Sequence, residues 1–274
     1  MSTMIALLLV LSALAGCSGE TLTNVKNAFP PPEKAPDPIS YTVEIEEFEE
    51  HFQDSEGREL AVCTYALPVL RGVDEEGRTL AEDQLSEEQR ALLQRFRQPF
   101  DSWEANAQAF AGHAGEDREA FGSEMVYSDD LQCSVYQTER LISISGTYCT
   151  YTGGAHYNTI LLSWNFDLET GEFFDPGLLD EETGLQEAVR EELTRQVRER
   201  AREADQPDFF WSDYPDTLEN WSSYAVSFGP EGMTVGFSPY ELACYAAGPQ
   251  VFLISYDQLE PHLGSHGRAL LGLD

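Results

Sequence analysis

One short stretch of the chain combines residue types that could carry out acid–base chemistry. His156 follows Gly153 and Gly154, two residues whose backbone can adopt angles closed to other amino acids. With Ser163 or Cys149 as the nucleophile, a base at His156 would make a hydrolase. The sequence holds neither a Gly-x-Ser-x-Gly elbow nor a His-Glu-x-x-His motif. We therefore favour a structural histidine at the start of a strand and keep the hydrolase as the alternative.

The remaining histidines and the cysteines do not form a metal-binding pattern. His262 and His266 are four residues apart, but Gly264 between them argues against a continuous helix that would present both rings on one face. The cysteines contain no Cys-x-x-Cys pair, which is the usual spacing in zinc sites. We therefore expect neither a metal ion nor a cofactor.

The first residues predict export and lipidation. Residues 5–15 form an apolar run of the length of a signal-peptide core, shorter than the roughly 20 residues that span a bilayer. The run ends in Leu-Ala-Gly-Cys at residues 14–17, which has the form of a lipobox, the motif whose cysteine receives a diacylglycerol. The first four residues lack the Lys or Arg that such leaders normally carry. We expect a signal peptide over residues 1–17 and a lipid on Cys17.

A tether and an acidic body should follow the anchor. Residues 18–38 include Pro30-Pro31-Pro32 and favour extended, polyproline-like conformations. The whole chain holds 16 Lys and Arg residues against 49 Asp and Glu residues, a formal net charge of −33. Nucleic acid and anionic lipid surfaces would repel this charge, so we expect membrane attachment through the lipid anchor only. The expected location is the outer face of the bacterial cell membrane.

Four cysteines remain after the lipobox, at Cys63, Cys133, Cys149 and Cys244. An even number in an exported chain permits two disulfides, and three pairings are possible. Buried free thiols are the alternative, because cysteines in strands pack as small hydrophobes. The sequence leaves both possibilities open.

Hydrophobic patterning predicts the elements that must position these side chains. Strand-like patterns cover residues 39–46, 58–70, 126–165, 222–228, 232–238 and 251–255. A capping box at Ser86 predicts a helix over residues 86–110 that Pro99 kinks or divides and that Gly112 and Gly115 end. A similar box at Thr183 predicts a helix over residues 183–204.

The order of these elements favours an α+β fold with largely antiparallel sheets, each packed by a helix. We expect two small subdomains, an N-terminal one over residues 39–138 and a C-terminal one over residues 139–274.

Two segments of the C-terminal part resemble a known family. These are the Gly-Gly-Ala-His core at residues 153–156 and the pattern Tyr-x-x-x-x-Tyr-x-x-Gly-Pro at residues 240–249. Together they are similar to the C-terminal domain of the RsiV-like and PdaC-like family, over about residues 139–264. That family includes extracytoplasmic domains of lysozyme-sensing anti-sigma factors and non-catalytic N-terminal regions of peptidoglycan deacetylases. Residues 39–138 look like the smaller domain that usually precedes it.

The resemblance implies a non-catalytic, exported binding or sensing module. We expect the chain to carry the shared module alone, without the deacetylase catalytic domain or the cytoplasmic part of the anti-sigma factors. We expect the partner to be a cationic envelope-active protein, with lysozyme as the first candidate, because the acidic chain would steer such a partner. The alternative is an acidic surface with no dedicated partner. The expected binding residues are Gly153, Gly154, His156, Tyr157, Tyr240 and Tyr245, and packing in the core is the alternative for the last two.

Overall fold

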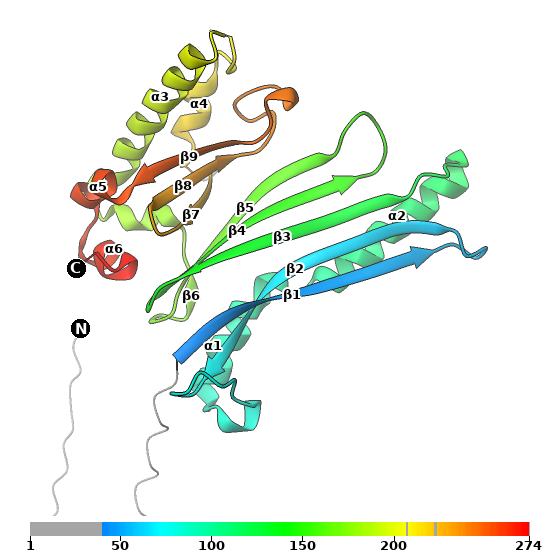
Figure 1. Cartoon of the computed structure of the whole chain (residues 1–274), viewed down its shortest axis with the longest axis horizontal. Coiled ribbons are helices and arrows are strands. Elements are labelled where there is room, and N and C mark those ends of the chain that lie inside the picture. The colour runs from blue at the N-terminus through cyan, green and yellow to red at the C-terminus, as the bar shows by residue number, and fades with distance from the viewer. Residues whose placement is uncertain (1–39, 207, 222–223, 274) are drawn as a thin grey trace, which may run out of the picture. The chain divides into compact units, whose positions relative to one another are not determined.

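Two β-sheets carry the fold, and each is covered by its own helices (Figure 1). The computed structural model describes residues 40–206, 208–221 and 224–273, so Cys17, the predicted signal peptide and the predicted tether lie outside the described residues. Within these ranges, the predicted α+β class is confirmed. None of the helices in the same ranges is long and apolar enough to cross a membrane.

The larger sheet has six strands in the order of the chain. They are β1 (Ser40–Gln53), β2 (Glu59–Val73), β3 (Tyr127–Gln137), β4 (Leu141–Tyr151), β5 (Asn158–Asp167) and β6 (Glu172–Phe173). All neighbours pair antiparallel except β2 and β3, which are parallel. A parallel pair needs a long crossover, and the helices between β2 and β3 supply it.

The crossover consists of α1 (Glu87–Arg97), a 3-10 turn at Gln98–Phe100 and α2 (Trp103–Phe121). The predicted capping box is confirmed, because Ser86 accepts a hydrogen bond from the backbone of Gln89. Pro99 divides the helix, as the sequence indicates. Phe96 and Phe100 pack these helices against Phe166 and neighbouring residues of the larger sheet.

The predicted end of this helix at Gly112 and Gly115 is wrong, because α2 continues to Phe121 and ends at Gly122 with φ +64°. Gly115 lies against the side chain of Leu60. The buried alanines of α2, Ala111 and Ala114, pack in one core cluster with Ala61 of β2. Tertiary packing thus outweighs the helix penalty of about 1 kcal/mol for each glycine.

The smaller sheet has three antiparallel strands, β7 (Ala225–Phe228), β8 (Gly232–Phe237) and β9 (Gln250–Ser255). Its helices are α3 (Leu185–Glu203), α4 (Tyr214–Glu219), α5 (Tyr256–Leu259) and α6 (Ser265–Leu271). Near them, 3-10 turns lie at Pro176–Asp180, Tyr245–Ala247 and Glu260–His262, and another lies before α1, at Glu82–Gln84. The predicted single helix near residues 183–204 is confirmed as α3. Its apolar stripe is buried in the same core as the strands, at Leu185, Val189, Leu193 and Val197.

The predicted capping box at Thr183 is wrong. Gly184 is the N-cap residue, with φ +80°, and the carboxylate of Asp180 accepts hydrogen bonds from the backbone N–H groups of Gly184 and Gln186. The Thr183 hydroxyl instead donates to the carbonyl oxygen of Asp180. Hydrogen bonds from the backbone, that of Gln186 first, lower the pKa of Asp180.

Buried hydrogen bonds join the two sheets. The Ser143 hydroxyl donates to Asn165 at 2.7 Å and accepts from the N–H of Phe228 at 2.7 Å, and the Asn165 amide donates to the carbonyl of Val226 at 2.8 Å. The β3–β4 hairpin crosses position 138, where we predicted the subdomain boundary. The division into 39–138 and 139–274 stays a prediction.

All four cysteines of the described body are free thiols. Cys63 and Cys133 are buried, and burial raises the pKa of their thiols to about 11 and about 12. Such thiols remain protonated and unreactive at neutral pH. Of the two alternatives, the structure therefore has buried free thiols at these positions.

Glu192 of α3 makes the stability of the fold depend on pH. Its side chain is 14% exposed and accepts two hydrogen bonds from Arg195, which lower the pKa of Glu192 to about 2 from an ordinary 4.5. Because the folded pKa is lower than the unfolded one, the stabilisation is present above about pH 4.5 and is lost as the pH falls toward 2.

We expect Glu192→Gln to lower the free energy of unfolding on the order of 1 kcal/mol at pH 7, with the difference from the parent chain shrinking at pH 3. Urea unfolding at the two pH values measures this. Glu187→Gln is the matched control, because Glu187 pairs with Arg190 on the same helix but is 58% exposed. An equal loss for both variants would contradict the prediction.

Candidate functional site

The tip of the β4–β5 hairpin holds the first predicted segment. Gly153 and Gly154 have φ values of +102° and +105°, which favour glycine. The hydroxyl of Tyr151 donates to the carbonyl oxygen of Gly154 at 3.2 Å. These angles fold the tip back so that His156 and Tyr157 are exposed at its end.

A strained turn holds the second segment. The N–H of Glu241 donates to the carbonyl of Ser238 at 3.1 Å, Pro239 is the second residue, and Tyr240 is the third with φ +74°. This is the pattern of a type II turn, whose third position normally holds glycine. A tyrosine there costs roughly 1–2 kcal/mol. The strained residue is also 58% exposed, a combination that suggests a role for the ring outside the fold.

Two side chains fix this turn beside β5. The Glu241 carboxylate accepts from the N–H of Ser238 at 2.6 Å, and the Ser238 hydroxyl accepts from the N–H of Leu161 at 3.1 Å. Burial raises the pKa of Glu241. The link to Leu161 positions Tyr240 next to the β4–β5 hairpin.

His156 is the centre of the contacts between the two segments. Its ring stacks on Tyr245 with centroids 3.6 Å apart and planes at 15°. Nδ1 lies 2.8 Å from the carbonyl oxygen of Tyr157, and Nε2 lies 3.3 Å from the hydroxyl of Tyr240. A carbonyl oxygen only accepts, so we assign the proton to Nδ1, and Nε2 accepts from Tyr240. Both ring nitrogens therefore have partners.

The structure brings together all six residues predicted for binding, although the two segments are 84 residues apart at the His156–Tyr240 contact. Tyr151 and Tyr157 have ring centroids 5.0 Å apart, and Tyr240 and Tyr245 lie at 5.9 Å. We define the aromatic cluster as Tyr151, His156, Tyr157, Tyr240 and Tyr245.

Two further residues lie next to the aromatic cluster, and no sequence pattern singled them out. The indole of Trp211 donates to the carbonyl of Tyr240 at 3.1 Å, and its backbone N–H donates to the carbonyl of Leu242 at 2.8 Å. Met125 packs against Gly153, where a Cβ atom would lie 3.0 Å from its sulfur. The aromatic run ending at Trp211 was visible in the sequence, but its pairing with residues 240–243 is tertiary.

Exposed apolar side chains are concentrated here. Those on the cluster or on the segments next to it are Met125, Val126, Tyr157, Ile160, Trp211 and Tyr240. Exposed apolar surface of this kind marks interaction sites more often than isolated apolar residues do.

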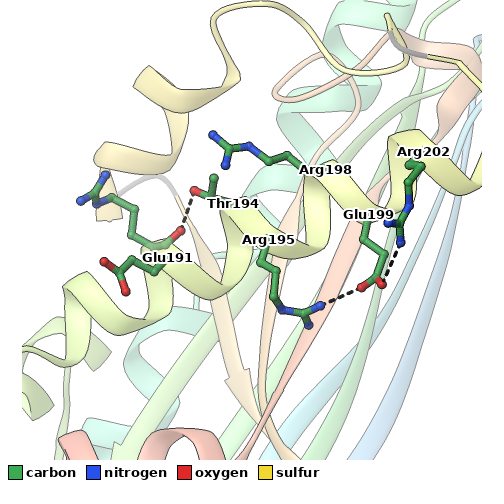
Figure 2. Close-up of a pocket in the computed structure, with 7 residues that line it drawn as sticks. Glu191, Thr194, Arg195, Arg198, Glu199 and Arg202 are labelled. Atoms are coloured by element: carbon green, nitrogen blue, oxygen red, sulfur yellow. Dashed lines mark hydrogen bonds and ion pairs between the residues drawn. The ribbon is translucent and has the colours of Figure 1, made fainter.

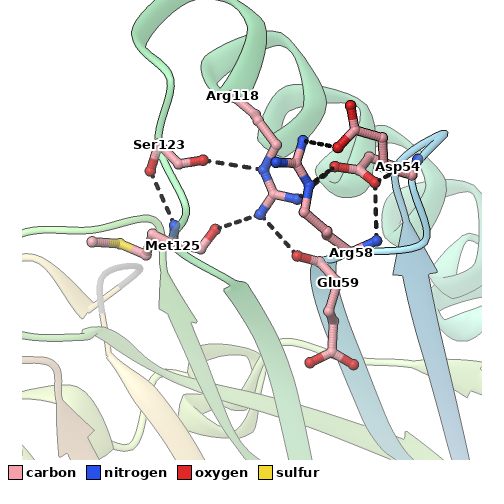
Figure 3. A network of polar contacts seen from close by, with 7 residues as sticks. Asp54, Arg58, Glu59, Arg118, Ser123 and Met125 are labelled. Atoms are coloured by element: carbon pink, nitrogen blue, oxygen red, sulfur yellow. Dashed lines mark hydrogen bonds and ion pairs between the residues drawn. The ribbon is translucent and has the colours of Figure 1, made fainter.

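Arg118 fixes the segment that carries Met125 (Figure 3). Its guanidinium donates to the carbonyl oxygens of Ser123, Glu59 and Met125 at 3.1, 2.8 and 3.3 Å and to the Asp54 carboxylate at 3.1 Å. The Arg118 side chain is only 12% exposed. Hydrogen bonds, that of the Arg58 N–H first, hold the pKa of Asp54 far below its usual range. The end of α2 is thereby attached to the β1–β2 turn and to the start of β3.

The residues of the hydrolase alternative do not hydrogen-bond to one another among the described residues. Ser163 lines a cavity of about 320 Å³ with Trp221 and Tyr224. The Cys149 sulfur lies 3.6 Å from the Thr159 hydroxyl. No hydrogen bond within the described ranges connects His156 to Ser163 or Cys149. Among the same residues, no group of three His, Cys, Asp or Glu side chains is placed to hold a metal ion.

A larger groove of about 580 Å³ follows the exposed face of α3 (Figure 2). Its charges largely neutralise one another, since Arg195 pairs with both Glu192 and Glu199, and Arg202 pairs with Glu199. We therefore place the candidate site at the aromatic cluster and not on α3.

Comparison with known proteins indicates a domain family whose function is unknown. Residues 171–257 match the family model described as a protein of unknown function, DUF3298. The chain is similar to the crystal structure of a DUF3298 family member from Bacteroides fragilis NCTC 9343, with a TM-score of 0.51, 16% identity, and coverage of 86% of this chain and 98% of that chain. No curated protein sequence matches it.

A second crystal structure, of a DUF3298 family protein from Pseudomonas aeruginosa PAO1, gives a TM-score of 0.46 and 19% identity, covering 84% of this chain and 96% of that chain. The likeness to the Bacteroides protein concerns the fold alone. The matched residues 171–257 contain Tyr240 and Tyr245 of the aromatic cluster and its neighbour Trp211, and the other three members of the cluster lie before them.

Proposed function

We propose that this chain is a lipid-anchored, extracytoplasmic binding module that holds a cationic envelope-active protein on the aromatic cluster, with lysozyme as the first candidate. The observation that supports the proposal most is the convergence of the six predicted residues on one exposed, partly strained surface. The net charge of −33 adds a long-range attraction for a basic partner.

The chemistry of the aromatic cluster suits a protein partner. Tyrosine offers a large contact area with few side-chain torsions to restrict, so it is common in binding surfaces. The exposed ring of Tyr240 can receive a Lys or Arg side chain on its face. Its hydroxyl already bonds to His156, which holds the ring in place before binding.

The hydrolase alternative has less support, because the contacts of His156 are to Tyr157, Tyr240 and Tyr245. The two functions predict different effects of His156→Ala. A binding module would lose affinity for its partner and show no turnover in either form, whereas a hydrolase would lose turnover with its fold intact.

Titration of lysozyme against the full chain at low and high salt tests the proposal, with cytochrome c as a basic control. Attraction by charge alone should fade as the screening length falls from about 10 Å at 0.1 M salt to about 3 Å at 1 M. We expect lysozyme to retain part of its affinity at high salt through aromatic contacts, and cytochrome c to lose its affinity. If lysozyme binds no better than cytochrome c at either salt concentration, the proposal fails and an undirected acidic surface is the better account.

The anchor is tested separately through Cys17. We expect Cys17→Ser to abolish lipid labelling and to release the protein from membranes or leave its leader uncleaved, because serine cannot form the thioether. Metabolic labelling with a radioactive fatty acid, membrane fractionation and intact mass measure these effects. Membrane retention and mass identical to those of the parent chain would rule out the lipoprotein assignment.

A further inference from the structure

A second candidate site lies at the junction of the two sheets, in the cavity of about 320 Å³ that Ser163 lines. We call it the inter-sheet cavity and define it by Ser163, Phe174, Asp175, Trp221 and Tyr224. Its volume is at the lower end of ligand pockets, which run from roughly 300 to 1,000 Å³. None of the described residues that line it belongs to the aromatic cluster.

The aromatic wall of the cavity is held in place by the fold. The rings of Trp221 and Tyr224 have centroids 5.4 Å apart, and Tyr224 packs edge-on against buried Phe237 at 5.0 Å. The Tyr224 hydroxyl donates to the carbonyl of Leu218. The backbone approaches the indole closely at Gly177, where a Cβ atom would lie 3.0 Å from the Trp221 nitrogen. These contacts fix both rings, so a ligand would meet a preformed surface.

Three polar groups of the cavity have hydrogen-bonding capacity that the described chain does not use. Asp175 accepts the N–H of Gly177 at 2.7 Å with Oδ1, which leaves Oδ2 available. The Ser163 hydroxyl and the Trp221 indole N–H make no hydrogen bond within the described residues. An indole N–H only donates, a carboxylate only accepts, and a hydroxyl does both.

This combination selects among ligand classes. A ligand that bonds to all of these groups must offer a hydrogen-bond acceptor to Trp221, a donor to Asp175 and an apolar face to the aromatic rings. An organic cation supplies donors but no acceptor, and a hydrocarbon supplies neither. A sugar ring supplies all three, because one face carries C–H groups and its hydroxyls both donate and accept.

We propose that the inter-sheet cavity binds one pyranose ring of a neutral saccharide, with the ring against Trp221 and Tyr224 and its hydroxyls bonded to Ser163 and Asp175. The volume equals that of about ten water molecules at roughly 30 Å³ each, which suits one ring and not an extended chain. The inference stands apart from the proposed function, because it does not require the aromatic cluster to bind a protein.

Isothermal titration of the full chain with N,N′,N″-triacetylchitotriose and with maltotriose tests the inference, and methylguanidinium serves as an organic cation that has no hydrogen-bond acceptor. We expect saturable binding of at least one saccharide at millimolar concentrations and none of methylguanidinium. Ser163→Ala should weaken this binding about fivefold, the effect of one hydrogen bond, and Trp221→Leu should weaken it tenfold or more.

The controls keep the test decisive even if Trp221→Leu fails to fold. Ser163→Ala removes a hydroxyl that bonds to no described residue, so its fold should be intact. Ser134→Ala is the matched control, because Ser134 lies in the same cross-strand row two strands away, through Ser145, and is exposed. We expect it to leave saccharide binding unchanged.

Three outcomes would overturn the inference. One is the absence of saturable binding by either saccharide. Another is saccharide affinity that Ser163→Ala and Trp221→Leu leave unchanged. The third is binding of methylguanidinium that Asp175→Asn abolishes, which would make the cavity a cation site. The asparagine oxygen can still accept from Gly177, so this variant tests the charge alone.

Discussion

Replacing Arg118 with methionine should lower the free energy of unfolding by about 3 kcal/mol, the cost of removing one member of a largely buried ion pair with several charged hydrogen bonds. The variant leaves the carbonyl oxygens of Ser123 and Glu59 without their donor, while Asp54 loses one cation. Methionine retains the unbranched apolar stem of the side chain, so the loss reports on the removal of the guanidinium group. Denaturant unfolding at neutral pH measures it.

Arg58→Met is the matched control, because Arg58 contacts the same Asp54 carboxylate but is 56% exposed. Removing its exposed ion pair should cost 1 kcal/mol or less. Arg118→Lys should recover only part of the stability, since one ammonium group cannot reach four acceptors in the planar arrangement that a guanidinium allows. Equal losses for the two methionine variants would show that the burial of Arg118 does not matter.

We expect Arg118→Met to affect the aromatic cluster as well. Arg118 bonds to the carbonyl of Met125, and the Met125 side chain packs against Gly153 at the hairpin tip. Loosening the start of β3 would therefore increase the freedom of the tip that presents His156. A stability network on one side of the larger sheet is in this way connected to the candidate site.

Local sequence signals predicted the elements well where one residue determines a boundary. Ser86 caps α1 as its capping box indicates, and Pro99 divides the helix. The same type of signal failed at Gly115, which lies inside α2 beside Leu60 and does not end the helix. The residue type is the same inside a helix and at its end, and the backbone of the folded chain distinguishes the two, as the left-handed φ of +64° at Gly122 does here.

Sheet topology and the site depend on longer-range information. The parallel pairing of β2 and β3 follows from the crossover through α1 and α2, which strand patterns alone do not encode. The resemblance to a known family pointed to both segments of the aromatic cluster, and their contact rests on the link between Ser238 and Leu161. Trp211 was missed because its partner Tyr240 lies 29 residues later in the chain.

Tyr240→Gly should weaken lysozyme binding tenfold or more while leaving the fold as stable as the parent chain or more stable by about 1 kcal/mol. Glycine adopts the φ of +74° without the strain that tyrosine bears there. The ring is 58% exposed, so its removal costs the folded state little buried area. The variant thus separates the two roles of residue 240, because it improves the turn and removes the binding surface.

Tyr240→Ala completes the test, because alanine lacks the ring but keeps the steric conflict at positive φ. We expect alanine and glycine to lose the same lysozyme affinity, and the alanine variant to be less stable than the glycine variant by about 1 kcal/mol. Thermal unfolding and the salt-dependent titration give the two quantities on the same samples. If Tyr240→Gly gains stability and keeps full affinity, the strained tyrosine serves something other than this partner. Loss of affinity without loss of stability would mean that the chain tolerates strain at this turn in order to present the ring.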